Sequence, residues 1–226
     1  MTSRLAGACA ITLANTSAVL LPERALWLPD HATLVVADLH WGKAAAFRAA
    51  HIPVPMGTTS SDLARLSSAL EATQASALVV LGDLLHAKSG RHDETFRTIA
   101  AWRTQHARVS ITLVRGNHDA HAGDPPAELG IVCVDSPYAL GPFVGVHEPE
   151  PWPDGYVLSG HLHPCVTVRG RGKQSARLPA FVFGPRVGVL PAFSSFTGGG
   201  MYERDDEDAL YVVAGDEVVS LARTDR

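Results

Sequence analysis

The sequence predicts a mixed α/β fold, a β-sandwich of two packed sheets with helices outside. Three observations lead to this prediction. Apolar strand-like runs alternate with helical stretches up to about residue 117, which is the rhythm of parallel β-α-β units. After Pro125 and Pro126, short strand-like runs follow one another without a long helix. Glycine and proline separate these runs, which is typical of antiparallel or mixed pairing in a second sheet.

The first half of the chain supplies the β-α-β part. Strands are predicted at 9–13, 18–21, 33–37, 77–81 and 109–114, and helices at 43–50, from Thr58 or Thr59 through 70, and at 93–106. The run at 33–37 is continuously apolar, which favours a strand buried on both faces. Pro53 and Pro55 end the first helix, because proline cannot continue it. Leu63, Leu66 and Leu70 recur at helical spacing and are expected to face the sheet, with Thr58 or Thr59 as N-cap.

The second half is expected to form the second sheet. Strands are predicted near 131–134, 143–146, 156–159, 165–168, 179–183, 187–190, 209–213 and 217–221. The chain of 226 residues has a mass of 24.0 kDa and no visible repeat, coiled-coil run or linker. We therefore expect one domain over residues 1–226.

Charge and cysteine content limit the classes of function. The net charge is −4, so any contact with nucleic acid should be local, because proteins that grip nucleic acid over their whole surface are usually basic. Cys9, Cys133 and Cys165 form neither a disulfide framework nor a metal-binding pair. Residues 4–14 resemble a signal peptide only roughly, and no run approaches the roughly 18 apolar residues of a membrane span. A cytoplasmic protein without membrane contact is expected.

Four short strings rich in histidine and carboxylate follow predicted strands. They are ADLH at 37–40, GDLLH at 82–86, GNHD at 116–119 and GHLH at 160–163. Ligands bind beyond the carboxyl ends of strands in open α/β sheets, where loops from separate strands converge. The four strings can therefore build one site.

The residue types in these strings indicate a metal centre. Asp38 and His40 are two residues apart and can chelate one ion from a loop, and the pair in GHLH repeats this spacing. Asp83 can bridge two cations, while Asn117 offers an amide oxygen. Nitrogen and oxygen ligands without thiolate suit manganese, iron or zinc rather than calcium or an iron–sulfur cluster. More than four ligands favour two metals, and a pair about 3.5–4 Å apart is a device for phosphoryl transfer.

In this order, DLH, GDLLH, GNHD and GHLH resemble the motifs of the calcineurin-like metallophosphoesterases. The strings ADLHWGKAAAFRAAHIPVP and LPAFSSFTGGG are similar to the ligase-associated DNA-damage-response metallophosphoesterase family, over nearly the whole chain. This resemblance implies two packed sheets with helices outside. It also implies two divalent metals that share Asp83, with manganese expected first and iron or zinc as alternatives. One implied set is Asp38, His40, Asp83 and His163, and the other is Asp83, Asn117, His147 and His161. The alternative for His147 is a structural role, because no rich string surrounds it.

Two further residues of GNHD are expected to act in catalysis. The nucleophile would be a hydroxide that bridges the metals. His118 could protonate the departing oxygen near neutral pH, and Asp119 beside it could orient or charge the imidazole. The alternative is that His118 positions the ligand Asn117.

Candidate substrate-binding residues lie near these strings. The GDLxH spacing that includes His86 is similar to the double-strand-break-repair nuclease branch of the superfamily, although His86 could instead tether the Asp83 loop. Lys43 could meet a substrate phosphate. Trp41 is expected to pack in the wall of the core rather than to stack on a nucleotide base.

The segment 165–187 carries five basic residues and no acidic one. They are Arg169, Arg171, Lys173, Arg177 and Arg186. Arg169 and Arg171 could belong to an arm that guides a polyanion to the metals. A plain surface hairpin is the alternative, because glycines and polar residues fill its turn.

The leading hypothesis is a two-metal phosphodiesterase that acts on nucleic acid, as an endonuclease in DNA repair. A DNA ligase and a helicase of a repair system are the expected partners. A phosphatase or cyclic-nucleotide phosphodiesterase acting on small molecules is the alternative. A scaffold with a degenerate metal site is a third hypothesis, which the complete set of ligands disfavours.

Overall fold

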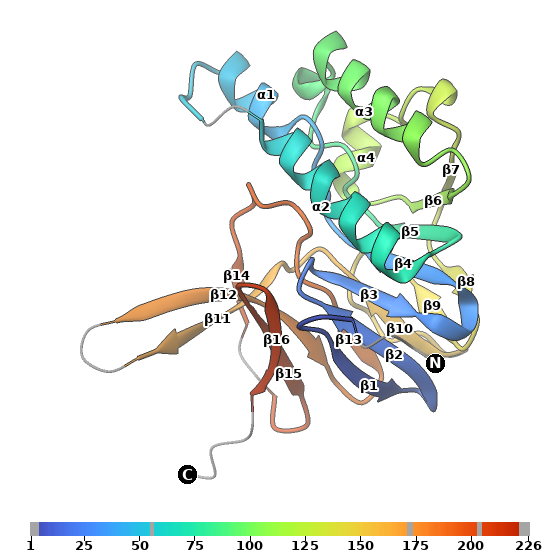
Figure 1. Cartoon of the computed structure of the whole chain (residues 1–226), viewed down its shortest axis with the longest axis vertical. Coiled ribbons are helices and arrows are strands. Elements are labelled where there is room, and N and C mark those ends of the chain that lie inside the picture. The colour runs from blue at the N-terminus through green and yellow to red at the C-terminus, as the bar shows by residue number, and fades with distance from the viewer. Residues whose placement is uncertain (1–4, 55–56, 171–173, 203–204, 222–226) are drawn as a thin grey trace.

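Two β-sheets pack face to face, and helices cover the outer face of the first sheet (Figure 1). The computed structural model describes residues 5–54, 57–170, 174–202 and 205–221. The two-sheet architecture predicted from the sequence is confirmed.

The first sheet contains seven strands in sequence order. They are β1 (Cys9–Leu13), β2 (Thr16–Leu21), β3 (Ala25–Leu28), β4 (Thr33–Val36), β5 (Ala77–Leu81), β6 (Ser110–Val114) and β7 (Ile131–Val134). Strands β1 to β4 pair antiparallel, and β4 to β7 pair parallel through helical crossovers. All four residues of β4 are buried, as its continuous apolar run predicts.

The helices follow the parallel strands. They are α1 (Lys43–Ala49), α2 (Thr58–Thr73), α3 (Asp93–Gln105) and α4 (Asn117–Ala122), with short 3₁₀ turns η1 (Pro29–His31), η2 (Lys88–Gly90) and η3 (Ala127–Leu129). Leu63, Leu66 and Leu70 of α2 are buried, as their spacing predicts. The predicted threonine cap is wrong: Gly57 is the N-cap, in a left-handed conformation and without a side-chain hydrogen bond.

The second sheet is mixed, as predicted. Its strands are β8 (Tyr138–Leu140), β9 (Phe143–Gly145), β10 (Tyr156–Ser159), β11 (Pro164–Arg169), β12 (Ser175–Phe183), β13 (Val187–Val189), β14 (Gly200–Met201), β15 (Ala209–Ala214) and β16 (Glu217–Leu221). The order is β14-β11-β12-β13-β10-β9-β8, and β15 joins β12 to β16. Strand β10 runs parallel to β9 and β13, whereas β11 and β12 form an antiparallel hairpin. This hairpin projects from the body of the molecule (Figure 1).

Two apolar layers hold these elements together. Between the sheets, Leu26 and Val35 pack with Leu158 and Phe181. Under the helices, Trp41 belongs to the other cluster, so its predicted place in the core is confirmed. Burying these apolar side chains away from water supplies the main favourable contribution to folding.

Three local expectations need correction. Residues 131–134 form β7 of the first sheet rather than part of the second, because they pair parallel with β6. The short strand 25–28 was not expected, since four residues after a proline-containing turn give little periodicity. Asn117 begins the short helix α4 and does not lie in a loop. Within the described parts of the chain, no helix has the length and apolar character needed to cross a bilayer.

Candidate metal centre

The four histidine- and carboxylate-rich strings meet at one edge of the sandwich. Asp38 and His40 follow β4, and Asp83 follows β5. Backbone hydrogen bonds join these two loops: the Asp38 N–H donates to the Gly82 carbonyl (3.2 Å) and the His40 N–H to the Asp83 carbonyl (2.8 Å). Asn117 follows β6, while the remaining histidines come from the second sheet after β9 and β10. Parallel strands end at the same edge, so loops from both sheets converge there.

Five of the expected ligands adopt left-handed backbone conformations. Their φ angles run from 46° at His40 to 69° at His161, and the others are Asp38, Asp83 and His163. Residues with a Cβ rarely adopt such angles, because the side chain crowds the following carbonyl. Such strain persists only where the surrounding structure imposes it, and it clusters at functional sites. Here the left-handed backbone turns five side chains toward the same edge of the sandwich.

The first expected ligand set is compact. One ligand atom from each of Asp38, His40, Asp83 and His163 lies within 4.8 Å of the others. His163 Nε2 lies 3.5 Å from Asp38 Oδ1 and 3.4 Å from His40 Nε2. Asp38, His40 and Asp83 are almost fully buried.

The second expected set gathers around His147. Its Nε2 lies 2.9 Å from Asn117 Oδ1, 3.0 Å from His161 Nδ1 and 3.4 Å from Asp83 Oδ1. His147 is buried, with an exposed fraction of 3%. The structure therefore brings all seven expected ligands together, and Asp83 lies between the two sets.

Hydrogen bonds around the histidines turn ring nitrogens toward these two spaces. His147 Nδ1 bonds the Leu81 carbonyl (3.1 Å) and His163 Nδ1 bonds the Gly198 carbonyl (3.2 Å). Because a carbonyl only accepts, each Nδ1 carries a proton and each Nε2 faces its space. Burial, and then the charge of Lys43, lowers the pKa of His40, which favours its neutral imidazole.

A cation fits these donors. Asp38 Oδ1 is buried without a hydrogen-bond partner and lies 3.5 Å from His163 Nε2. A buried carboxylate is costly unless a proton donor or a cation compensates its charge, and a metal ion between this oxygen and the imidazole would do so. The donor set, with nitrogen and oxygen and no thiolate, fits manganese, iron or zinc.

His118 lies at the open side of the first set. Its Nδ1 lies 2.7 Å from the His86 carbonyl, so Nε2 faces the centre, 3.9 Å from Asp83 Oδ2. The His118 and His86 rings stack with centroids 4.9 Å apart, and both meet the edge of His40. Burial, then the charges of Lys43 and His118, lowers the pKa of His86 to about 4. His86 thus orients His118 through its carbonyl and packs on its ring.

Asp119 does not orient His118, contrary to the expectation from their adjacency. Its buried carboxylate accepts from the Leu85 N–H (3.1 Å) and the Gly116 N–H (2.9 Å). As the third residue of α4, Asp119 reaches back to the residue before the helix, which is a capping interaction. It therefore ties the β5 and β6 loops together.

We expect Asp119→Ala to lower the free energy of unfolding by roughly 2–4 kcal/mol, because two buried N–H groups lose their acceptor. Thermal or urea unfolding would measure this. Asp93→Ala, at the exposed start of α3, is the matched control and should cost about 1 kcal/mol or less. If Asp119→Ala has the stability of the parent protein but no activity, Asp119 does not hold the β5 and β6 loops together and acts in catalysis instead.

Gly82 lets the second set assemble. Its φ is +78°, and a Cβ there would lie 2.0 Å from His147 Nδ1. Gly82→Ala should therefore displace the imidazole, and we expect activity to fall at least about tenfold with weakened metal binding.

Gly215→Ala is the matched control for this substitution. Gly215 has a similar φ, +68°, but a Cβ there meets nothing within 4 Å. Both variants should lose roughly 1–2 kcal/mol of stability through the left-handed conformation. Only Gly82→Ala should lose metal, as measured by elemental analysis after gel filtration. Equal activity of the two variants would contradict the role of this close approach.

The candidate substrate residues differ in position. Lys43 lies beside the centre, where its Nζ donates to Thr197 Oγ1 (3.1 Å). Arg169 is exposed at the end of β11, opposite Ser175. Arg171 and Lys173 lie outside the described residues. Arg186 is not on the hairpin: it precedes β13 and donates to the Trp152 carbonyl (2.7 Å).

Three residues that the sequence did not single out hold the loop 190–200 against the centre. Arg24 donates to the Ser194 carbonyl (3.0 Å), and Arg65 to the Phe193 carbonyl. Asp62 accepts from Arg65 (2.9 Å) and from the Ser195 N–H (3.1 Å). The string LPAFSSFTGGG was a signal for this loop, but nothing local in the sequence indicates its partners.

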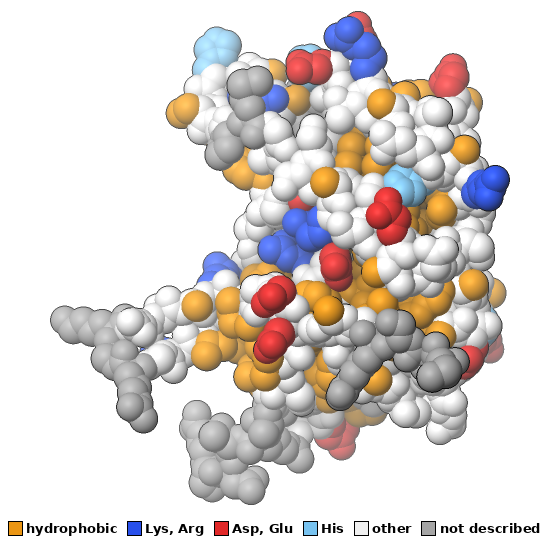
Figure 2. Space-filling model, viewed as in Figure 1, with side chains coloured by type: hydrophobic (Ala, Val, Ile, Leu, Met, Phe, Trp, Pro, Cys, Tyr) orange, Lys and Arg blue, Asp and Glu red, His pale blue; other side chains and the backbone are white. Residues whose placement is uncertain are grey.

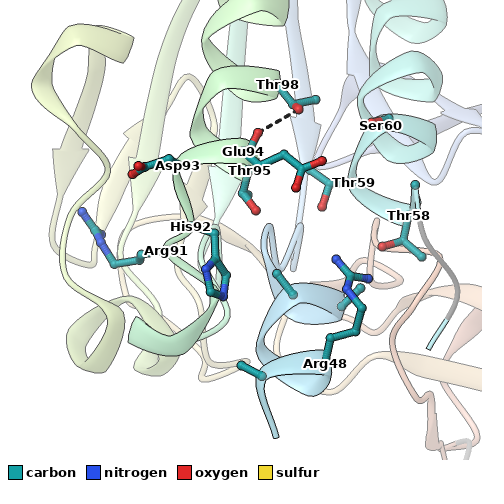
Figure 3. A pocket seen from close by; sticks show the side chains of 14 residues that line it. Arg48, Thr58, Thr59, Ser60, Arg91, His92, Asp93, Glu94, Thr95 and Thr98 are labelled. Carbon is teal, nitrogen blue, oxygen red and sulfur yellow. Dashed lines mark hydrogen bonds between the residues drawn. The ribbon is translucent and has the colours of Figure 1, made fainter. Parts of the chain in front are cut away.

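A cavity of about 690 Å³ lies apart from these ligands, between α1 and the beginnings of α2 and α3 (Figure 3). Arg48 and Arg91 line it, but so do Asp93 and Glu94. None of the expected metal ligands lines it. We place the chemistry at the histidine and carboxylate cluster, because buried ligand atoms and left-handed backbone conformations coincide there.

Comparisons with known proteins agree with this fold. A family model described as calcineurin-like phosphoesterase matches residues 31–163. The solved structure of the Pseudomonas putida nuclease MPE is 39% identical and superposes with a TM-score of 0.84. That match covers 95% of this chain and 100% of the nuclease. A comparison with curated proteins finds no significant match.

Proposed function

This chain belongs to the calcineurin-like phosphoesterase family and is a metal-dependent phosphoesterase, and from that premise we propose that it hydrolyses phosphodiester bonds of nucleic acid. The observation that carries the proposal is the donor set: seven side chains converge on two adjacent spaces that share Asp83. Similarity to a nuclease over 95% of the chain favours a polynucleotide over a small phosphodiester.

Two divalent ions would be held by the two sets of donors. Asp38, His40, Asp83 and His163 would hold one ion, and Asp83, Asn117, His147 and His161 the other. When bound, such a pair activates water near neutral pH and neutralises charge on the phosphoryl group. Manganese is the ion we propose, with iron or zinc as alternatives.

The protein's own residues would orient the substrate and move the proton. His118 Nε2 is the atom that would give a proton to the leaving oxygen, because the His86 carbonyl occupies Nδ1. Lys43 would meet a substrate phosphate oxygen at the rim, where Thr197 now accepts its hydrogen bond. The half-buried His86 ring would keep water from the far side of His118.

A role in DNA repair, with a DNA ligase and a helicase as partners, is the biological setting we propose. Support comes from the similarity of the loop 190–200 and of residues 37–55 to the ligase-associated family. The three free cysteines fit a reducing compartment such as the cytoplasm.

A substrate panel tests the proposal. The protein loaded with Mn²⁺ would be given single-stranded, duplex and nicked DNA, RNA, a cyclic nucleotide and bis(4-nitrophenyl) phosphate. Cleavage of internal bonds in a polynucleotide is the expected result. If kcat/KM is highest for the cyclic nucleotide or for bis(4-nitrophenyl) phosphate and the polynucleotides remain intact, the small-molecule alternative is correct. If the metal-loaded protein hydrolyses none of these substrates, the scaffold hypothesis is supported instead.

A further inference from the structure

A small pocket adjoins the metal centre behind His163. Its volume is about 220 Å³, smaller than the roughly 300–1,000 Å³ of pockets that enclose a whole ligand. It suits one group of a larger molecule. We call it the arginine pocket, and its polar lining comprises Arg24, Arg177, Ser194, Ser195, Thr197 and His163.

The arginine pocket is positively charged. Among the residues that the structure describes, no aspartate or glutamate lines it. Arg24 Nη1 donates to the carbonyls of Ala192 (3.3 Å) and Ser194 (3.0 Å), and Arg177 Nη2 donates to the Gly199 carbonyl. Each guanidinium has five N–H groups, so both retain donors for an anion. Burial, and then the charge of Arg65, lowers the pKa of Arg24, so an anion in the pocket would stabilise its charged form.

One imidazole separates this pocket from the metal centre. His163 Nε2 faces Asp38 Oδ1 at 3.5 Å, while its Nδ1 bonds Gly198 in the wall of the pocket. Lys43 reaches Thr197 from the opposite side. Lysine and arginine side chains lie in the hollow between α1 and the β11–β12 hairpin, with aspartate and glutamate side chains at its edge, on the face shown in Figure 2. A chain with repeated phosphates could therefore contact both sites at once.

We propose that the arginine pocket is a phosphate subsite, which binds a backbone phosphate neighbouring the scissile one in a polynucleotide strand. The inference rests on the proposed function and names its substrate contact. The planar guanidinium matches phosphate oxygens in a bidentate manner, and the hydroxyls of Ser195 and Thr197 add donors. A small diester has a single phosphate at the metals and leaves the subsite empty.

Arg177→Gln tests this subsite. Arg177 is exposed, and glutamine can still donate to the Gly199 carbonyl while it removes the charge. We expect KM for a single-stranded oligonucleotide to rise about tenfold. The slope of log affinity against log salt should become less steep by about 0.7, the value for one phosphate on a single strand. kcat/KM for bis(4-nitrophenyl) phosphate should fall by a much smaller factor.

Two further variants complete the test. Arg177→Lys keeps the charge and should restore most of the salt dependence. Arg186→Gln is the matched control, since Arg186 is another exposed arginine that donates to a loop carbonyl. Wild-type KM and salt slope in Arg177→Gln would overturn the subsite, and so would equal losses on both substrates, which would make Arg177 a support for the loop.

The proposed nucleic-acid function and the proposed phosphate subsite can be tested separately. If the unaltered protein hydrolyses the small diester but neither binds nor cleaves oligonucleotides, the nucleic-acid function is wrong and the subsite fails with it. If the unaltered protein cleaves oligonucleotides and Arg177→Gln does so with the same KM and salt slope, only the subsite is wrong.

Discussion

Asp83→Asn is expected to reduce turnover by more than about 100-fold while the protein stays folded. Asp83 lies between the two sets of donors, with Oδ2 3.9 Å from His40 Nε2 and Oδ1 3.4 Å from His147 Nε2. Substituting groups that only support metal ligands already costs roughly 10–100-fold, and this substitution removes the shared charge itself. Metal content should fall to one ion or none, as elemental analysis after gel filtration would measure.

Stability measurements separate loss of metal from loss of fold. Burial raises the pKa of Asp83, and the neighbouring Asp38 raises it further, so the ionised carboxylate is unfavourable without a cation. The metal-free variant should therefore melt at or above the temperature of the metal-free parent. Added Mn²⁺ should raise the melting temperature of the parent far more than that of the variant.

Asp124→Asn is the matched control for this charge removal. Asp124 forms a surface ion pair with Arg115 (2.8 Å), and such pairs contribute about 0–1 kcal/mol. It should keep full activity and both metals. An Asp83→Asn protein that is active with two tightly bound ions would sink the assignment of Asp83 as the shared ligand.

His118→Ala is expected to lower kcat on an oligonucleotide by about 10²–10⁴-fold, the usual contribution of general acid catalysis. Loss on bis(4-nitrophenyl) phosphate should be much smaller, because a departing nitrophenolate needs little protonation. The ring lies beside Asp83 and is not among the seven donors of the two sets, so the metal content should be unchanged. The comparison requires kcat of the parent protein and of His118→Ala, measured with each substrate at saturating concentration.

His92→Ala is the matched control, since His92 is exposed just before α3 and remote from the donors. It should leave both substrates unaffected. Equal losses on both substrates in His118→Ala would make the His118 ring a group that positions the neighbouring ligand Asn117 rather than a proton donor. The proton donor would then have to be sought among other groups.

Local sequence patterns were enough to locate most strands and the four strings that converge at the centre. Strand β5 was predicted with its observed ends, because apolar periodicity and flanking turn residues act over a few neighbours. The strings ADLH, GDLLH, GNHD and GHLH could be recognised for the same reason, since each combines ligand types at short spacing. Short elements such as β3 and β14 escaped, because two to four residues carry too little pattern.

Contacts between side chains that are far apart in the sequence could not be predicted from local patterns. His147 has no local signal, yet it lies at the centre of the second set because β9 runs beside β10 in the second sheet. Asp119 adjoins His118 in sequence, but the helix that begins at Asn117 turns its carboxylate to backbone amides. Arg24 meets Ser194 across 170 residues. Such contacts depend on how the two sheets pack, and packing is a property of the whole chain that no local pattern records.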